Sequence, residues 1–209
     1  HTSGRSLWES TWIQIKSTQT FLVQNPRLTK LFVARYFYMI SVTTGSTFGV
    51  LYGIKTIGFT EREVELVLLV GALVSIPSAV AWGFLVDRIG PALALKWNIL
   101  GWVLILAGSV SIPWLNLDNQ LWWPLGAITG MCFGGLWVAD RPLLIQLSPS
   151  NLGEMFGIYG TISRLAFLTG SFTWSLIAVT LDMGQTWAVF VLMCCSTIGF
   201  LILIKYQRS

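Results

Sequence analysis

The chain has 209 residues, of which 54% are hydrophobic and only 11% are charged, and its mean hydropathy is +0.69. A soluble domain normally carries about a quarter charged residues, so this composition excludes an ordinary water-exposed surface and predicts an integral membrane protein. The net charge of +4 does not indicate nucleic-acid binding, because the basic residues are dispersed and form no stripe with interleaved aromatic residues.

Residues 1–30 differ in kind from the rest of the chain. Trp8, Trp12 and other apolar residues alternate there with polar ones at roughly helical spacing. This pattern predicts an amphipathic linker segment that lies at the cytoplasmic membrane interface and ends at Asn25–Pro26. Because the chain begins with His1 and not with Met, we expect it to be a piece of a longer polypeptide or a processed product.

Six apolar runs follow within residues 31–209, each close to the ~20 residues that a membrane-spanning helix needs. Backbone polar groups in lipid must be satisfied within the segment, and the runs lack the alternation of barrel strands. The sequence therefore predicts an all-α integral membrane domain of six transmembrane helices. We expect them at residues 31–54, 64–85, 92–112, 121–143, 153–180 and 186–204.

Charged residues divide unequally between the two sides of this predicted bundle. Eleven of the thirteen basic residues fall on or near the side of the N-terminus, whereas Lys55 and Arg62 fall on the other side with five of the nine acidic residues. Positive charge favours the cytoplasmic side. We therefore expect a multi-pass protein of the plasma membrane, which in bacteria is the inner membrane, with both termini in the cytoplasm.

Opposite charges interrupt the apolar sequence between the second and third runs, in the stretch GFLVDRIGPALALK. Gly83 and Gly90 frame Asp87 and Arg88 and permit a tight turn. Asp87 can accept hydrogen bonds at a helix N-terminus, where the dipole favours an anion. From these residues alone, a functional loop and a plain, positively charged turn are equally open.

A second polar stretch lies between the fourth and fifth runs. Asp140 and Arg141 end the fourth run, and Gly153 and Glu154 open the fifth. Asn151 and Glu154 have the spacing of a capping box, which predicts a helix start at this point. We therefore expect Asp140, Arg141, Gly153 and Glu154 to belong to a second cytoplasmic loop.

These two loops resemble those of the major facilitator superfamily. Residues 83–90 are similar to the signature that follows the second span of each six-helix half in that family, and residues 153–159 (GEMFGIY) are similar to a loop of its vacuole effluxer-like branch. The resemblance implies the C-terminal half of a secondary active transporter that moves a small solute, with amino acids as one possibility, by alternating access. The first loop would be its cytoplasmic gate.

The same resemblance implies three partners: a small-molecule substrate, the lipid bilayer and a missing N-terminal six-helix half. A non-transporting membrane scaffold or assembly factor with the same fold is the alternative, because fold does not fix function. A transporter needs a polar path that contains Arg164, whereas a scaffold could fill that space with Trp and Phe.

Two arginines fall within the apolar runs. Arg164 lies ten residues past Glu154, which is about 15 Å along a helix. A charge at that depth marks by default a pathway or a partner in the bundle, so we expect Arg164 to line a substrate or ion pathway, with snorkelling toward the interface as the alternative. Arg35 lies only about one turn inside the first run, and we expect it to be a snorkelling anchor.

Small residues recur at every fourth position in two of the runs, and such stripes predict close helix packing in lipid. They are Ser41, Gly45, Gly49 and Gly53 in the first run, and Gly126, Gly130 and Gly134 in the fourth.

The sequence shows no constellation typical of an enzyme, a cofactor site or a metal site. The one histidine is terminal, and the three cysteines fall inside apolar runs without metal-ligand spacing. No glycine loop with a phosphate-binding lysine is present either. We therefore expect a protein without catalytic activity, cofactor or metal.

Overall fold

The computed structural model describes residues 22–148 and 152–207 of the chain. The predicted linker, residues 1–30, lies largely outside these residues. The first long helix begins at Pro26, five residues before the predicted span. Proline suits the first helical turn because its missing N–H would have no partner within the helix there.

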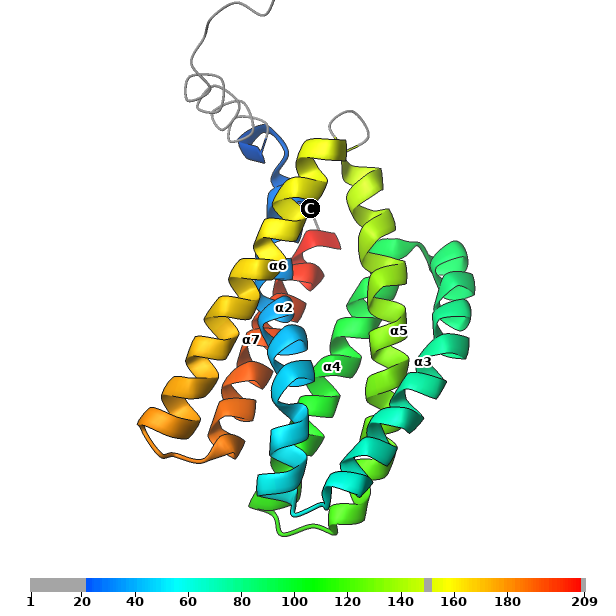
Figure 1. Ribbon diagram of the computed structural model, residues 1–209. Coiled ribbons are helices and arrows are strands. Elements are labelled where there is room, and N and C mark those ends of the chain that lie inside the picture. The colour runs from blue at the N-terminus through cyan, green and yellow to red at the C-terminus, as the bar shows by residue number, and fades with distance from the viewer. Residues whose placement is uncertain (1–21, 149–151, 208–209) are drawn as a thin grey trace, which may run out of the picture.

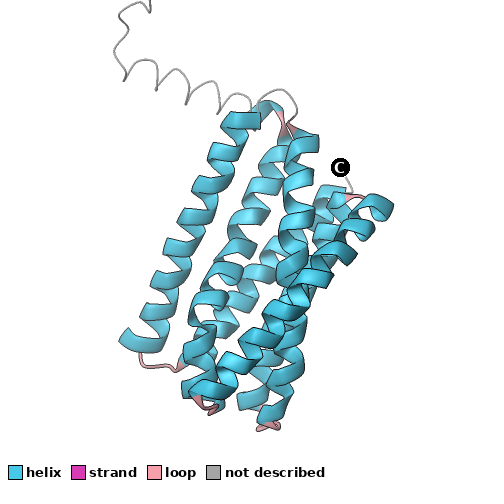
Figure 2. Ribbon diagram, turned by 45° about the vertical axis from the view of Figure 1, so that its right-hand side comes forward, coloured by secondary structure: helices cyan, strands magenta, loops and turns pink. Residues whose placement is uncertain are grey.

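Among the described residues, every segment of regular structure is a helix (Figures 1 and 2). Two of the long helices continue as short π-helical turns, and a 3-10 turn precedes another. In chain order the elements are α2 (Pro26–Tyr52), η1 (Gly53–Ile57), α3 (Glu61–Ile89), α4 (Pro91–Trp114), η2 (Asn119–Leu121), α5 (Trp122–Leu147), α6 (Leu152–Ser175), η3 (Leu176–Thr180) and α7 (Gln185–Gln207).

This architecture confirms the predicted all-α membrane fold, and the six long helices match their predicted spans to within five residues. Five of them, α3 to α7, are long and apolar enough to cross a membrane. The helix α2 is not among these five, although it has 27 residues. Some of its polar side chains bond locally: the Thr43 and Thr47 hydroxyls donate to carbonyls one turn earlier on the same helix.

Local sequence explains where the helices begin and end. The hydroxyl of Thr60 accepts a hydrogen bond from the Glu63 N–H, and the Glu63 carboxylate accepts one from the Thr60 N–H, which forms a capping box at the start of α3. Gly90, with φ of +81°, separates α3 from α4, because glycine adopts that conformation without steric cost. Pro91 then opens α4.

Each long helix packs mainly against one or two others. The helix α2 packs against α6 and α7, α4 packs against α5 and α7, and the main partner of α3 is α5. Both described termini lie at one end of the bundle, together with the α3–α4 and α5–α6 connections (Figure 1). We call this the terminal end and the other the opposite end.

The predicted glycine stripe of α5 lies against α3 and confirms close packing there. A Cβ atom at Gly130 would collide with the backbone of Gly71, and one at Gly134 would collide with the carbonyl of Ser75. Because backbone atoms cannot move aside as side chains can, these glycines are required for the close contact of α3 and α5.

The predicted stripe of α2 is not continuous, and the expectation was wrong at its centre. Ser41 donates a hydrogen bond to the Leu192 carbonyl of α7, and Gly53 lies against Val64 of α3. A Cβ atom at Gly45 or Gly49, in contrast, would meet no other described atom within 4 Å. These two glycines therefore leave space instead of bringing helices together.

Replacing Gly130 by alanine should destabilise the bundle. The new methyl group overlaps the Gly71 backbone, and overpacking of this kind costs typically 1–3 kcal/mol. Gly160→Ala is the matched control on α6, because its Cβ atom would meet nothing described within 4 Å and alanine is the better helix former. Thermal unfolding in detergent measures both variants, and equal midpoints would contradict the α3–α5 contact.

Candidate functional site

A salt bridge between Arg35 of α2 and Asp140 of α5 lies entirely inside the bundle. Both side chains are 0% exposed. Arg35 lies nine residues after the start of α2, and Asp140 lies seven residues before the end of α5, so both are about 10–13 Å from the terminal end. Charges buried this deeply persist only when they are paired and hydrogen-bonded.

Three further side chains complete what we call the charge cluster, which consists of Arg35, Tyr38, Asp140, Tyr159 and Ser163. The hydroxyls of Tyr38 and Tyr159 each donate to a different carboxylate oxygen of Asp140, both at 2.9 Å. Nη2 of Arg35 donates to the Ser163 hydroxyl at 2.9 Å. The Arg35 guanidinium also lies 3.2 Å from the centre of the Tyr159 ring, in the range of a cation–π contact.

Helical spacing brings these side chains together. Arg35 and Tyr38 are three residues apart on α2, and Tyr159 and Ser163 are four apart on α6, so each pair shares a helix face. The cluster therefore joins α2 and α6 to α5, a helix that otherwise packs mainly on α3 and α4.

The structure corrects two expectations about these residues. Asp140 and Arg141 do not lie in a loop, because α5 continues through Pro142 as far as Leu147. Arg35 does not snorkel to the interface but is fully buried. The sequence pattern predicted that Asp140 ends one span and that Arg35 anchors another at the interface. In the structure these two side chains form an ion pair inside the bundle. Arg141 is exposed and lies 5.4 Å from the ring centre of Trp137.

Tyr38, Tyr159 and Ser163 were not predicted as site residues. The sequence did contain a signal for the ion pair. Arg35 and Asp140 carry opposite charges and lie at similar depth from the same side of the predicted bundle. Their pairing across 105 positions of sequence is visible only in the fold. The tyrosines give no separate signal, since aromatic residues are common throughout this chain.

The four residues of the predicted gate loop do not form a loop. Gly83, Asp87 and Arg88 lie in the last two turns of α3, and only Gly90 stands at the junction between helices. Asp87 and Arg88 are exposed. Within the part of the chain that the structure describes, neither makes a hydrogen bond or an ion pair. Asp87 therefore lies at a helix C-terminus, where the dipole favours Arg88 and not an anion.

Gly153 and Glu154 lie in the first turn of α6 and not in a connecting loop. An acidic residue at that position complements the helix dipole. The Glu154 side chain is half-buried, and its Oε1 atom has no hydrogen-bond partner among the described residues. Asn151, the other member of the predicted capping box, lies outside the described residues.

Arg164 is exposed on α6, directly after Ser163 of the charge cluster. It makes no hydrogen bond or ion pair with residues 22–148 or 152–207. The anionic partner that we expect for it thus lies outside this set, and its role in a pathway stays a prediction.

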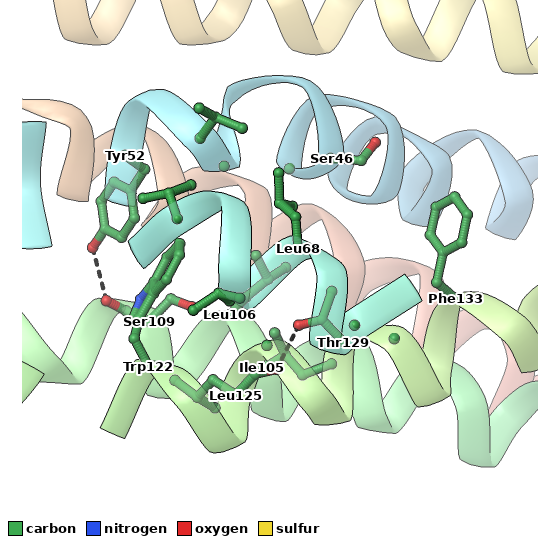
Figure 3. A pocket seen from close by; sticks show the side chains of 18 of the residues that line it. Ser46, Tyr52, Leu68, Ile105, Leu106, Ser109, Trp122, Leu125, Thr129 and Phe133 are labelled. Carbon is green, nitrogen blue, oxygen red and sulfur yellow. Dashed lines mark hydrogen bonds between the residues drawn. The ribbon is translucent and has the colours of Figure 1, made fainter. Parts of the chain in front are cut away.

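A cavity of about 370 Å³ lies between α2, α3, α4 and α5, on the side of the charge cluster that faces the opposite end. Figure 3 shows Tyr52 at one end of it, with its hydroxyl donating to the Ser109 carbonyl at 2.7 Å, and Phe133 at the other. Leu68, Leu106 and other apolar side chains lie between them. The lining does not include Arg164.

The described residues contain no group of three or more histidine, cysteine, aspartate or glutamate side chains that could hold a metal ion.

The fold and the site together define a helical membrane domain with a buried charge pair. The sequence matches the Major Facilitator Superfamily over residues 2–171. The chain belongs to this family. The comparison with curated protein sequences found no match.

Two solved structures are similar in fold. They are crystal structures of a bacterial homologue of the iron transporter ferroportin in the outward-facing state, one with soaked iron and one without. Each has a TM-score of 0.67, and the sequence identities are 19% and 18%. The alignment covers 88% of this chain and 46% of the homologue, so this chain spans about half the length of these structures.

Removing either charge of the pair should destabilise the protein. Asp140→Asn leaves Arg35 buried without a counter-charge, and Arg35→Met does the same to Asp140, which costs about 3–5 kcal/mol in each case. The double variant carries neither charge, so its loss of unfolding free energy should be smaller than the sum of the single losses. Chemical unfolding in detergent measures this double-mutant cycle.

Asp87→Asn is the matched control for this cycle, because it removes an exposed carboxylate without described contacts and should change stability by less than about 0.5 kcal/mol. Additive losses in the Arg35/Asp140 cycle would show that the two charges do not depend on each other.

Proposed function

We propose that this chain is the C-terminal half of a secondary active transporter, which moves a small solute by alternating access together with an N-terminal six-helix half. The observation that carries this proposal is the charge cluster. Ionisable residues within a membrane domain are costly and mark by default a pathway, a relay or a moving contact. Apolar residues often replace a buried ion pair without loss of stability, so stability alone does not account for this one.

The cluster lies where a moving contact is needed. It holds α2 and α6 against α5 near the terminal end, while the cavity separates α2 from α3 and α5 nearer the opposite end. In this arrangement the cluster joins α2, α5 and α6 on the terminal side of the cavity. Protonation of Asp140 would remove the counter-charge of Arg35 and weaken that link, so a proton gradient could drive the change.

The terminal end faces the cytoplasm in this proposal. Arg27, Arg88, Lys96 and Lys205 belong to this end of the helices, whereas Glu61, Glu63 and Glu65 lie at the start of α3, at the opposite end. The excess of basic residues follows the positive-inside rule.

Asp87, Arg88 and Arg164 take part in this proposal through contacts with the missing half. Their side chains are exposed in this chain, and a neighbouring six-helix half would offer partners. We assign Asp87 and Arg88 to the cytoplasmic gate. Arg164 would meet an anionic group, either of the other half or of the solute.

A scaffold or assembly factor of the same fold is the second candidate, and one observation favours it. The cavity is lined by Trp102, Trp122 and Phe133 and does not contain Arg164, as expected for a bundle without a polar path. The open space within these aromatic walls favours the transporter.

Topology is tested by labelling single cysteines with a membrane-impermeant maleimide in intact cells. The background carries alanine at Cys132, Cys194 and Cys195. Asp182→Cys, in the turn between η3 and α7, should react with the reagent from outside. Arg88→Cys should react only after the cells are permeabilised. Reaction of both positions from the same side would contradict the spanning bundle, and the reverse pattern would contradict a cytoplasmic terminal end.

Alternating access is tested in the full-length polypeptide by the reactivity of Ser46→Cys, an exposed position in the cavity wall. A transporter should expose this cysteine to the outside in one state, and Asp140→Asn should raise its reactivity from the cytoplasmic side and lower it from outside. Asp87→Asn and Arg164→Ala should shift the same ratio if these residues contact the missing half. A scaffold predicts no reaction from either side in any variant.

A further inference from the structure

The Asp140 carboxylate is separated from water by other side chains of the bundle. It is 0% exposed, and no member of the charge cluster lines the cavity. On the terminal side lies a small apolar cluster, which consists of Leu28, Phe32, Leu144, Met155 and Tyr159. In this conformation a proton therefore reaches Asp140 only through a group that touches its carboxylate.

Three side chains contact the carboxylate, and they differ in what they can do with a proton. Arg35 forms the ion pair, but a guanidinium keeps its protons in proteins. The hydroxyls of Tyr38 and Tyr159 each donate to one carboxylate oxygen. A hydroxyl both donates and accepts hydrogen bonds, so it can pass one proton on while it takes up another. Ser163 bonds Arg35 and the Tyr159 carbonyl instead.

Only one of the two tyrosines leads to the surface. Tyr38 is 0% exposed, and the other described partner of its hydroxyl is Arg35, whose Nη1 donates to it at 3.4 Å. A proton cannot come from there. Tyr159 is 7% exposed, and its hydroxyl also interacts with the guanidinium of Arg141, an exposed residue. Among the described residues, Tyr159 thus connects Asp140 to the exposed surface.

Other charged residues lie nearer the terminal end on the neighbouring helices. None of them takes part in the ion pair or the hydrogen bonds described for Asp140. They are Arg27 and Lys30 on α2, Asp87 and Arg88 on α3, Lys96 on α4 and Glu154 on α6. The groups that act directly on Asp140 are therefore Arg35, Tyr38 and Tyr159, with Arg141 next to the last of these.

We propose that Tyr159 is the proton relay between the terminal end and Asp140. This inference rests on the proton-driven transport proposed above and names the route by which the proton reaches its site. It also gives that route a side, because in this conformation the cluster exchanges protons with the terminal end and not with the cavity.

The relay step conserves the tyrosine. A hydronium ion at the terminal end gives a proton to the Tyr159 oxygen and becomes water. The original phenolic O–H bond breaks, and its proton forms a new O–H bond on Oδ2 of Asp140. The carboxyl group is then neutral, and its ion pair with Arg35 is lost. The positive charge of Arg141 stabilises the negative charge that develops on the phenolic oxygen during the transfer.

The test follows the protonation of Asp140 by infrared spectroscopy, with the full-length polypeptide in lipid nanodiscs. A protonated carboxyl group gives a C=O stretching band, and the band that is missing in Asp140→Asn belongs to Asp140. Rapid lowering of the pH measures the rate at which this band appears, and stepwise titration gives its midpoint.

Tyr159→Phe and Tyr38→Phe are the matched variants for this test. Each removes one hydroxyl that donates to the charged carboxylate, so each should move the midpoint to higher pH by a similar amount. Tyr159→Phe also removes the relay and should slow the appearance of the band by roughly 100-fold. Tyr38→Phe should move the midpoint without a comparable loss of rate. Elution as a single species in size-exclusion chromatography verifies the fold of each variant.

Equal loss of rate in both variants would overturn the relay, because the tyrosines would then act only through the geometry of the cluster. An unchanged rate in Tyr159→Phe would overturn it as well, since the proton would reach Asp140 by another route. If no band of Asp140 appears at any pH at which the protein stays folded, both the relay and the proton coupling are wrong.

The accessibility of Ser46→Cys separates this inference from the transport function. If its reactivity alternates but Tyr159→Phe loses no rate, the relay is wrong and the transporter stands. If Tyr159→Phe alone slows protonation but Ser46→Cys reacts from neither side, the relay stands and transport is refuted.

Discussion

A guanidinium and a carboxylate that lie wholly out of water must remain paired, and the positions of three helices depend on this requirement. Arg35 and Asp140 satisfy most of it through each other and through the hydroxyls of Tyr38, Tyr159 and Ser163. Sliding α2 or α6 by one residue along α5 would separate donors from acceptors by about 1.5 Å. Apolar contacts in a lipid environment tolerate such a slide, because they are not directional. The cluster therefore fixes the register of α2, α5 and α6.

The helices of this bundle are held together by two physically different kinds of contact. Between α3 and α5, glycines bring the backbones so close that a single methyl group at Gly130 has no room, and such a contact transmits motion as a rigid unit. Between α5 and the pair α2 and α6, the charge cluster lies beside a small apolar cluster of Leu28, Phe32, Leu144, Met155 and Tyr159, and the two together form the described link. A rearrangement that opens the bundle would thus separate α2 and α6 from α5, because one change of charge weakens that link.

The sequence predicted what depends on local pattern and missed what depends on distant pairs. Apolar runs located all six helices, and the stripe through Gly130 identified a real close contact. The same reasoning wrongly predicted that a helix ends at Asp140 and that Arg35 lies at the interface. Hydropathy treats every charged residue as unfavourable in the membrane and contains no information about an ion-pair partner 105 residues away. The stripe through Gly49 looked the same as that through Gly130, yet it borders a cavity. Only the neighbouring helices distinguish a glycine that permits contact from one that leaves space.

The charge cluster and the cavity are separate in space but are built on the same helices. The helix α2 carries Arg35 at one level, with Gly45 about 15 Å and Gly49 about 21 Å further along, and α5 carries Asp140 and the cavity residue Trp122. In the proposed transporter, a solute that changes the spacing of α2 and α5 in the cavity would also change the distance between Arg35 and Asp140, because helices behave as nearly rigid rods. The reverse holds as well, since loss of the ion pair frees the two helices to move at the cavity. A coupling of this kind needs no charge on the solute, because the response is carried by the spacing of two helices that both sites share.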